Sequence, residues 1–500
     1  MLYKIKKIIA HYTFKYYLLN ICYMIFMFGF LKKLVITTII FALILSSTAI
    51  SSCNVDLKEK HTMMSLDLLD FDIVIPNDFP TIQEGVDHAD SGNVILVREG
   101  IYKEHLFINK TSLTIIGADK YNTILDGCKT NGQGIVVRSE NVVIKNLTIT
   151  NFKDGSRDEI FSYDHAGVEL QKANATIENN RFIDNGVGIE LFDTALNTTI
   201  INNEMINDGL LIGNYYQSSD FPNLTPLCFV HNINNNTVNG KPLYYFKDQK
   251  DFTVPTDAGQ ITMVNCTNFT IKNIHMSNND FSILLAFCYD SLIENITITH
   301  TSGESLLFAC ENITIQNNII VDTFKAICLE YKSKNNIVRN NDISKNYVGI
   351  SLFNNASNNL IYNNKVYSNR GPMSAGIEIV SYHGGTQQEN NISKNEIYNN
   401  PIGIRFRENT TNTTVYLNNI TDNMFGMFME LFSDNNNIIY NNFRKNIIQA
   451  FFNGCSENNW ENNYWNRPRF LPKAIFGFKP VGKMEIPYVN FDKNPALKSI

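Results

Sequence analysis

The chain carries little charge for its length. Asp, Glu, Lys and Arg make up 18 % of its 500 residues, the net charge is -6, and no run of Lys or Arg occurs beyond the N-terminal segment. Nucleic-acid binding needs a basic face, so this composition argues against a nucleic-acid partner. Seven of the nine cysteines lie after Cys53. An odd number does not fit a complete framework of disulfides.

A helical period is also missing, and so is the leucine consensus of leucine-rich repeats. What recurs instead is the pair Asn-Asn, often at a spacing of 23 residues, preceded by segments such as TIENN, TIQNN and LIYNN. A segment of the form Gly-aliphatic-x-aliphatic recurs along with these pairs, as GVEL, GIEL, GISL, GIEI and GIRF. The pairs are Asn179-Asn180, Asn202-Asn203, Asn317-Asn318, Asn340-Asn341, Asn363-Asn364, Asn418-Asn419, Asn441-Asn442 and Asn462-Asn463.

This period predicts an all-β fold, a right-handed parallel β-helix with coils of about 22–23 residues whose short strands pair one coil on, about 4.8 Å away. About a dozen coils are expected at that strand spacing. Asparagine tolerates the left-handed conformation that a sharp corner requires. Stacked in register, the amides can also satisfy buried polar groups. Asparagine-rich sequence is often disordered, but the alternation of apolar residues contradicts disorder here.

The period also divides the chain. Residues 1–53 read as a signal peptide or membrane anchor, with a basic start at Lys32-Lys33 and an apolar run behind it, and translation from Met27 is one interpretation. The segment before Cys53 resembles a lipidation site. Residues 54–75 are then a linker, 76–461 the β-helix with an insertion at about 210–257, and 462–500 an irregular C-terminal cap. An N-terminal capping helix is expected within 76–90, with Thr81 as N-cap and Glu84 completing a capping box.

A family resemblance follows from these segments. NDFPTIQEGVDHADSGNVILVREGIY resembles the start of pectin-lyase-like β-helix proteins, including pectin methylesterases. NGKPLYYF, the INN-type repeats and NNYWNRPRFLPK resemble the secreted NosD-like proteins, which carry the carbohydrate-binding and sugar-hydrolase repeat. The resemblance covers the chain from about residue 78 onward. It implies the fold but not one activity, since lyases, hydrolases, epimerases, adhesins and a copper-related accessory protein share the repeat.

The motifs of the best-known enzymes with this fold are missing. The polygalacturonase carboxylates and the pectin methylesterase aspartate signature are both absent, which argues against those activities. Alignment of the coils places Glu169 under Glu190 and Glu378 beside Arg405. Neighbouring carboxylates could share a proton, bind a cation or act as acid and base, whereas the simpler interpretation is a solvated strand face with a weak Glu378–Arg405 ion pair. The low-probability catalytic candidates are Glu169, Glu190, Tyr163, Asp164 and His165.

Two further groups are candidates for binding. Cys266, Cys288 and Cys310 lie 22 residues apart and should stack on successive coils. They could bind copper or zinc, or form an interior column of small apolar side chains. The aromatics of the insertion could stack on sugar rings, or could pack the insertion onto the rod. The glycan-binding candidates among them are Tyr215, Tyr216, Tyr244 and Tyr245.

The sequence thus favours an exported, cell-surface β-helix protein that binds or organises glycans without catalysis and without a required cofactor. Its partner would be a polysaccharide or cell-surface glycan, and membrane contact would run only through the N-terminal segment. Two alternatives stay open. One is an enzyme acting on acidic polysaccharide, and the other is a NosD-like copper-delivery accessory.

Overall fold

A computed structural model describes residues 71–500, except 131, 154–164, 215–223, 372, 382–386, 456 and 482–483. The chain is an all-β right-handed parallel β-helix of about 16 turns with almost no helix, which confirms the predicted fold. It has more turns than the dozen expected from the repeat. The expected insertion at about 210–257 is one reason, because its residues form strands that pair with the coils around them.

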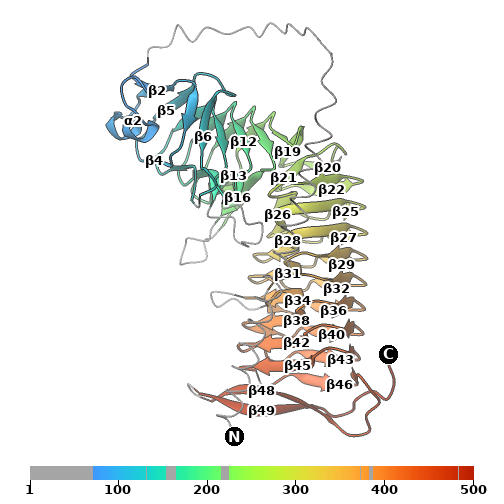
Figure 1. Cartoon of the computed structure of the whole chain (residues 1–500). Helices are drawn as coiled ribbons and strands as arrows, with labels where there is room; N and C mark the ends of the chain where they lie inside the picture. The colour runs from blue at the N-terminus through green and yellow to red at the C-terminus, as the bar shows by residue number, and fades with distance from the viewer. Residues whose placement is uncertain are drawn as a thin grey trace, which may run out of the picture. The chain divides into compact units, whose positions relative to one another are not determined.

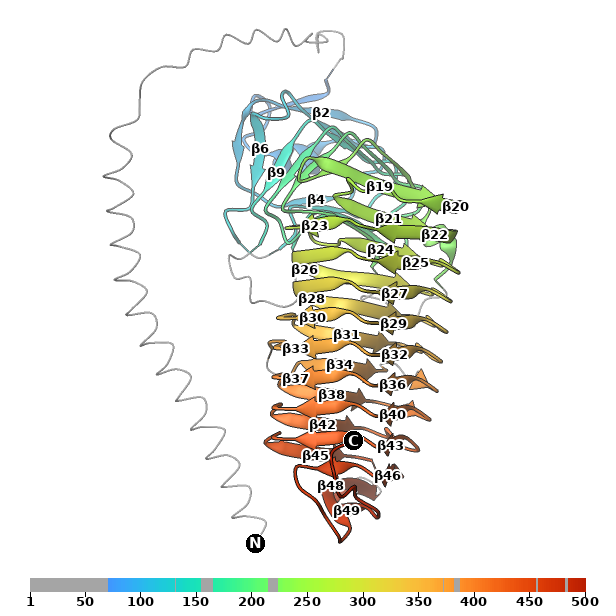
Figure 2. The same cartoon turned by 90° about the vertical axis from the view of Figure 1, so that its right-hand side faces the viewer.

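Each turn contributes strands to three parallel sheets, which we call faces A, B and C, and the strands of a face follow one another down the solenoid (Figures 1 and 2). Face A consists of β1 Ile73–Ile75, β2 Val94–Val97, β5 Thr114–Gly117, β8 Val143–Lys145, β11 Thr176–Glu178, β14 Thr199–Ile201, β17 Asn232–Asn234, β20 Lys250–Thr253, β22 Thr267–Lys272, β25 Leu292–Glu294, β27 Thr314–Gln316, β29 Ile337–Arg339, β32 Leu360–Tyr362, β36 Asn391–Ser393, β40 Thr414–Tyr416, β43 Asn437–Ile439 and β46 Asn459–Glu461.

Face B consists of β3 Gly100–Tyr102, β6 Thr123–Asp126, β9 Thr148–Thr150, β12 Arg181–Ile183, β15 Glu204–Ile206, β18 Thr237–Val238, β23 His275–Ser277, the first parts of β26 Thr297–Phe308 and β28 Ile319–Glu330, β30 Asp342–Ser344, β33 Lys365–Tyr367, β37 Glu396–Tyr398, β41 Asn419–Thr421, β44 Asn442–Arg444 and β47 Tyr464–Trp465. Face C consists of β4 Leu106–Ile108, β7 Ile135–Val137, β10 Ala166–Leu170, β13 Val187–Phe192, β16 Leu210–Asn214, β19 Lys241–Lys247, β21 Gln260–Val264, β24 Ile283–Ala286, the last parts of β26 and β28, β31 Val348–Phe353, β34 Ala375–Val380, β38 Ile402–Arg407, β42 Phe425–Glu430, β45 Ile448–Asn453 and β48 Lys473–Val481.

Two short strands, β35 Gln387–Gln388 and β39 Thr410–Thr411, pair with each other outside the three faces.

The pairing of strands is interrupted once, which divides the solenoid into a first stack (β1–β18) and a second stack (β19–β49). Face C of the first stack ends at β16, and β18 pairs with β19 in the antiparallel direction. The expected insertion is therefore the junction of two stacks. The period alone could not show this, because the junction strands carry the same alternation as any coil.

Side chains of the second stack complete the hydrogen bonding at the junction. Gln260 accepts from the N–H of Leu210 at 2.9 Å and donates to its carbonyl at 2.6 Å, so its amide replaces a missing strand. Asp280 accepts from the N–H groups of Gly188 at 3.0 Å and Gly209 at 2.6 Å. Burial raises the pKa of Asp280 to about 7. Burial and the charge of Asp280 together hold the pKa of the buried Asp208 well above its ordinary value.

The asparagine pairs do two separate jobs, as the sequence predicted for the residue type. In most pairs the first asparagine takes the left-handed conformation, as Asn363 does with φ 55°. The second is buried, and its amide oxygen accepts from the backbone and side chain of its counterpart one coil earlier, as in Asn364 accepting from Asn341 at 3.1 and 2.9 Å. In two coils the left-handed residue is not an asparagine: Leu417 has φ 56° and Tyr440 also has φ 56°.

The longest amide column runs through the second stack and has a defined end. Its last amide, Asn463, donates from its backbone N–H and its side chain to Asp492 Oδ2, at 3.0 and 3.2 Å. The indole N–H of Trp465 donates to the same oxygen at 2.8 Å. The column consists of Asn318, Asn341, Asn364, Asn395, Asn418, Asn441 and Asn463.

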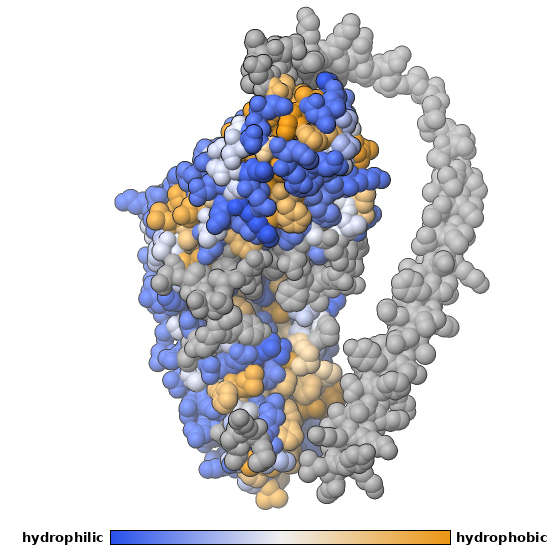
Figure 3. Space-filling model, turned by 90° about the vertical axis from the view of Figure 1, so that its left-hand side faces the viewer, coloured by the Kyte–Doolittle hydropathy of each residue, from blue (hydrophilic) through white to orange (hydrophobic). Residues whose placement is uncertain are grey.

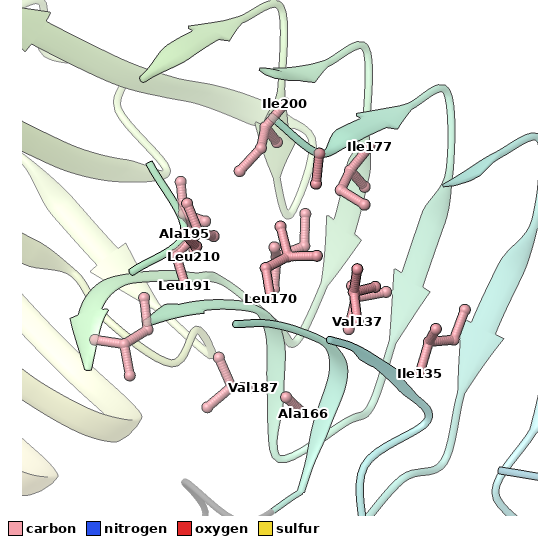
Figure 4. Packing of buried hydrophobic residues seen from close by; sticks show 14 of the residues in the cluster. Ile135, Val137, Ala166, Leu170, Ile177, Val187, Leu191, Ala195, Ile200 and Leu210 are labelled. Atoms are coloured by element: carbon pink, nitrogen blue, oxygen red, sulfur yellow. The ribbon is translucent and has the colours of Figure 1, made fainter. Parts of the chain in front are cut away.

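The interior between the faces is apolar. In the first stack Ile135, Val137 and Leu170 come from neighbouring strands of face C and lie with the face A residue Ile177 in one cluster of fully buried side chains (Figure 4). Each coil adds such residues to a continuous core, and no coil could bury them alone. Stacking therefore supplies most of the hydrophobic stabilisation.

The two ends of the solenoid are capped differently. Helix α2 (Ile82–His88) covers the first end, and Thr81 accepts from the N–H of Glu84 at 3.1 Å, as the N-cap prediction required. Glu104 accepts from two more free N–H groups of this helix, at 3.0 and 2.9 Å. Strand β1 precedes the helix and pairs with β2, so the solenoid begins within the expected linker. The C-terminal cap is more regular than expected, because β48 and β49 (Met484–Asp492) form an antiparallel hairpin.

Candidate functional site

The carboxylates of Glu169 and Glu190 are brought together as the coil alignment predicted. Glu169 on β10 pairs directly with Glu190 on β13, so the two side chains leave face C on adjacent coils. They are not on a solvated face: their exposures are 2 % and 0 %. Gln171 donates its side-chain amide to Glu169.

The rest of the proposed catalytic group is only partly described. Tyr163 and Asp164 lie outside the described residues. His165 accepts from the N–H of Gly132 at 2.9 Å through Nδ1. Glu169 follows His165 by four residues of extended chain, roughly 13 Å at the rise of a strand.

The three stacked cysteines lie in the interior. Cys266, Cys288 and Cys310 have 0 % exposure and belong to the apolar core of the second stack. All three are free thiols. The pKa of Cys266 is raised by the hydrogen bond with Cys288 and by burial, and burial raises that of Cys288 well above its ordinary value. The structure thus places the column in the interior, where free cysteines commonly pack as small apolar side chains.

The two described tyrosines of the insertion, Tyr244 and Tyr245, do not form one platform. Tyr215 and Tyr216 lie outside the described residues. Tyr244 pairs with Ile261, stacks on Phe246 at 5.8 Å and packs partly buried against the core of the second stack. Tyr245 points to the opposite side of β19, where its hydroxyl donates to the carbonyl of Phe229 at 2.7 Å. Alternate residues of a strand face opposite sides, so these two rings cannot contact the same sugar.

The expected ion pair between Glu378 and Arg405 is replaced by two other contacts. The residues are neighbours in register, but the Arg405 guanidinium pairs with Glu430 at 2.7 Å. Glu378 accepts from the hydroxyl of Ser351 at 3.0 Å. Glu378 and Arg405 are 8 % and 9 % exposed, so the description of this face as solvated strand is wrong. Strand alternation shows which side chains point outward, but it does not show what covers them.

A second group on face C was not found from the sequence. Glu304 of β26 and Lys325, Cys328 and Glu330 of β28 are all buried on the outward side, and Lys325 Nζ lies 3.1 Å from Glu304 Oε2. One ligand atom from each of Glu304, Cys328 and Glu330 lies within 4.8 Å of the others. Burial raises the pKa of Glu330 to about 8, against the effect of a hydrogen bond with Asn354. The register shifts on both sides of Glu304 hid this group, because they remove it from the regular spacing.

Face A of the second stack carries an ordered polar row. Glu294 accepts from the Gln316 amide at 2.9 Å, and Gln316 accepts from Arg339 Nε at 2.8 Å. Arg339 then donates to the hydroxyl of Tyr362 at 2.9 Å. Tyr416 lies in the same column two coils further on. We call these five half-buried residues the face A row. The variable third letter of the TIQNN, IVRNN and LIYNN segments encodes it, and this signal was present in the sequence.

In the view of Figure 3, apolar side chains gather toward the C-terminal end of the solenoid and also appear over its N-terminal coils, among mostly hydrophilic side chains. Ile447, Phe470 and Leu471 are 81 %, 87 % and 77 % exposed.

The N-terminal targeting segment expected at residues 1–53 lies outside the described residues. Within the part of the chain that the structure describes, no helix has the length and apolar character to cross a membrane.

Comparison with known proteins gives one family and a set of distant structures. The family model for the right-handed beta helix region matches residues 215–366. The A-module of mannuronan C-5 epimerase AlgE4 from Azotobacter vinelandii is 13 % identical, with 77 % of this chain and 82 % of that chain covered and a TM-score of 0.32. The surface adhesin PfbA of Streptococcus pneumoniae is 14 % identical, with coverage of 83 % and 94 % and a TM-score of 0.36.

A third structure, a hyperthermoactive exopolygalacturonase from Thermotoga maritima, is 10 % identical, with coverage of 82 % and 89 % and a TM-score of 0.33. No curated protein sequence matches the chain. The narrower NosD-like resemblance, with its copper-related role, stays a prediction. The matched region and the stacked coils agree on the fold: this chain is a right-handed parallel β-helix protein.

Proposed function

We propose that the protein is exported and binds an extended polysaccharide along the face A row, without catalysing its cleavage. The observation that carries this proposal is the continuous hydrogen-bonded line from Glu294 through Gln316 and Arg339 to Tyr362. Each member comes from the next coil, so the line runs along the solenoid, as a bound polymer would. The side chains hold one another in place before any ligand arrives, which lowers the entropy cost of binding.

The chemistry of the row suits sugars. Tyrosine offers an apolar ring and a hydroxyl, and arginine and glutamine offer directed hydrogen bonds, which is the mixture found in ligand sites. Tyr362 and Tyr416 are two coils apart, with Ser393 between them, or roughly 9–10 Å at the spacing of paired strands. Two rings at this separation can contact alternate sugar units of an extended chain while the short serine leaves room for the unit between them.

The number of carboxyl groups in the face A row supports binding over catalysis on this face. Glycoside hydrolysis ordinarily uses two carboxyl groups on opposite sides of the scissile bond. The face A row has only one, Glu294, and its Oε2 is engaged by Gln316. The arrangement therefore supports recognition along the polymer.

The test is a glycan panel that includes neutral and uronic-acid polysaccharides, probed with the full chain. Tyr362→Ala and Arg339→Gln are each expected to weaken binding about tenfold, which is 1.4 kcal/mol. The matched control is Tyr367→Ala, which removes a half-buried tyrosine from face B. Binding that is lost in the face B variant and retained in both face A variants would contradict the proposal, as would the absence of any bound glycan.

A second candidate function is supported by the buried pair Glu169 and Glu190. Two carboxyl groups on adjacent coils have the chemistry for acid–base work on an acidic polysaccharide. The full chain would be incubated with uronic-acid polysaccharides while unsaturated products and reducing ends are measured. Turnover that is lost in Glu169→Gln and Glu190→Gln would favour the enzyme, whereas turnover that survives both would place catalysis elsewhere.

A further inference from the structure

The outward side of face C holds two buried glutamates, a buried cysteine and a buried lysine in one group. Glu304, Cys328 and Glu330 are 3 %, 0 % and 2 % exposed, and Lys325 is 7 % exposed. Lys325 Nζ lies 3.1 Å from Glu304 Oε2 and 4.0 Å from Cys328 Sγ, so the ammonium group is placed to compensate Glu304. Within the described residues no ion pair includes Glu330. A carboxylate buried at this depth is costly unless something compensates it.

Glu330 has a carboxylate oxygen without a partner. Among the residues that the structure describes, Glu330 Oε1 has no hydrogen-bond partner. Glu330 also offers one carboxylate oxygen to the set of ligand atoms from Glu304, Cys328 and Glu330 that lie within 4.8 Å of one another. Buried polar atoms in native proteins nearly always have a partner, so an orphaned oxygen here calls for a ligand.

The backbone explains why the three side chains converge. Cys328 and Glu330 are two residues apart on β28 and therefore project to the same side. Glu304 comes from β26, one coil earlier, and shifts in strand register on both sides of it place it opposite Lys325. Irregularities of this kind often redirect a side chain at a functional position.

We infer that Glu304, Cys328 and Glu330 form a binding site for one zinc ion, a role outside the proposed glycan binding. A thiol among the ligands disfavours magnesium and calcium, which take oxygen ligands, and favours a transition metal. Zinc accepts cysteine together with carboxylates, and three protein ligands leave its fourth position for water or another group. The ion supplies the positive charge that Glu330 lacks.

Lys325 lowers the affinity of this site for zinc. Its ammonium group lies beside two of the ligand atoms and repels an incoming cation. It also lies 4.9 Å from the ring centre of Phe353, which holds the charge in place. Removal of this charge should therefore strengthen zinc binding, whereas removal of a ligand should weaken it.

Zinc binding to the metal-stripped full chain would be measured by calorimetry, and the site would be identified by cobalt substitution. One zinc per chain is expected, with Cys328→Ser and Glu330→Gln each weakening binding at least tenfold and Lys325→Met strengthening it. The cobalt-loaded wild type should show a thiolate charge-transfer band that is missing in Cys328→Ser. Glu330→Gln is nearly isosteric, and a melting curve equal to that of the wild type without metal would establish that this variant folds.

Cys288→Ser and Glu396→Gln are the matched controls. The first removes a buried thiol of the interior column, and the second an exposed carboxylate of face B. Neither should change zinc affinity. The inference is overturned if the wild type binds no stoichiometric zinc, if binding survives both ligand variants, or if Cys288→Ser abolishes it while Cys328→Ser does not.

Discussion

The two members of an asparagine pair should differ greatly in what they contribute to stability, and Asn363 with Asn364 gives the sharpest test. Asn364 lies inside the amide column. Its oxygen accepts from the N–H and the side-chain amide of Asn341, and its own amide donates to the carbonyl of Val338 at 2.8 Å. Asn363 has φ 55°, and its exposed side chain donates only to Asn340, at 2.6 Å.

Asn364→Ala leaves at least two or three buried polar groups without partners. Each costs about 1–3 kcal/mol, so unfolding should become easier by roughly 3–6 kcal/mol. Asn363→Ala keeps the buried amide column and forces alanine into the left-handed conformation, which costs about 1–2 kcal/mol. Asn363→Gly should change the free energy of unfolding by less than about 1 kcal/mol, because glycine takes this conformation freely.

The assay is urea unfolding of the full chain and the three variants, with hydrogen exchange of the Asn341 N–H as a local measurement. A solenoid can open coil by coil, so the exchange rate reports on the column even where global unfolding is not two-state. The expected order of stability is wild type, Asn363→Gly, Asn363→Ala and then Asn364→Ala. The reasoning would be refuted if Asn364→Ala were no less stable than Asn363→Ala and left exchange at Asn341 unchanged.

Three further outcomes are expected. Leu417→Asn should stabilise the chain by about 1 kcal/mol in urea unfolding, since Leu417 has φ 56°, and a loss of stability would contradict the conformational argument. Because the pKa of Asp280 is raised to about 7 in the folded chain, the folded state binds more protons and stability should fall as pH rises from about 4 to 7. When unfolding is compared at pH 4.5 and 8, Asp280→Asn should remove roughly 3 kcal/mol of that fall, at about 1.4 kcal/mol per pH unit, and an unchanged pH slope would refute this assignment. Glu104→Ala should speed hydrogen exchange in α2 by about tenfold through the loss of two N–H acceptors, and unchanged exchange would show that water replaces them.

The solenoid was predictable from the sequence because each coil repeats the same local rule. The second asparagine of LIYNN is buried in every such coil, and GIxL forms the same strand of face C each time. These assignments need only spacing and alternation. The start of the helix at Thr81 could be predicted for the same reason, since an N-cap depends only on residues within one turn.

The junction and the charged groups of face C could not be predicted in the same way. The antiparallel contact of β18 with β19 depends on residues far apart in the sequence, such as Gln260 with Leu210. Burial of Glu190 and Glu378 depends on what lies over the face, and alternation carries no information about that. Glu304 was missed because a change in strand register hides it from any fixed spacing.

The hydrogen bonds of the amide column in the second stack all point the same way, from each coil to the next, and the column ends at Asp492. Every asparagine in the column presents donors to the following coil, so a last asparagine would present unsatisfied donors at the end of the rod. A carboxylate oxygen that takes three donors closes the series without offering a new one. A second molecule that docked on this end would find no free amide donors in this column to extend it. Asp492 thus ends the column much as a chain terminator ends a polymer. It also opposes end-to-end growth of the solenoid into fibres.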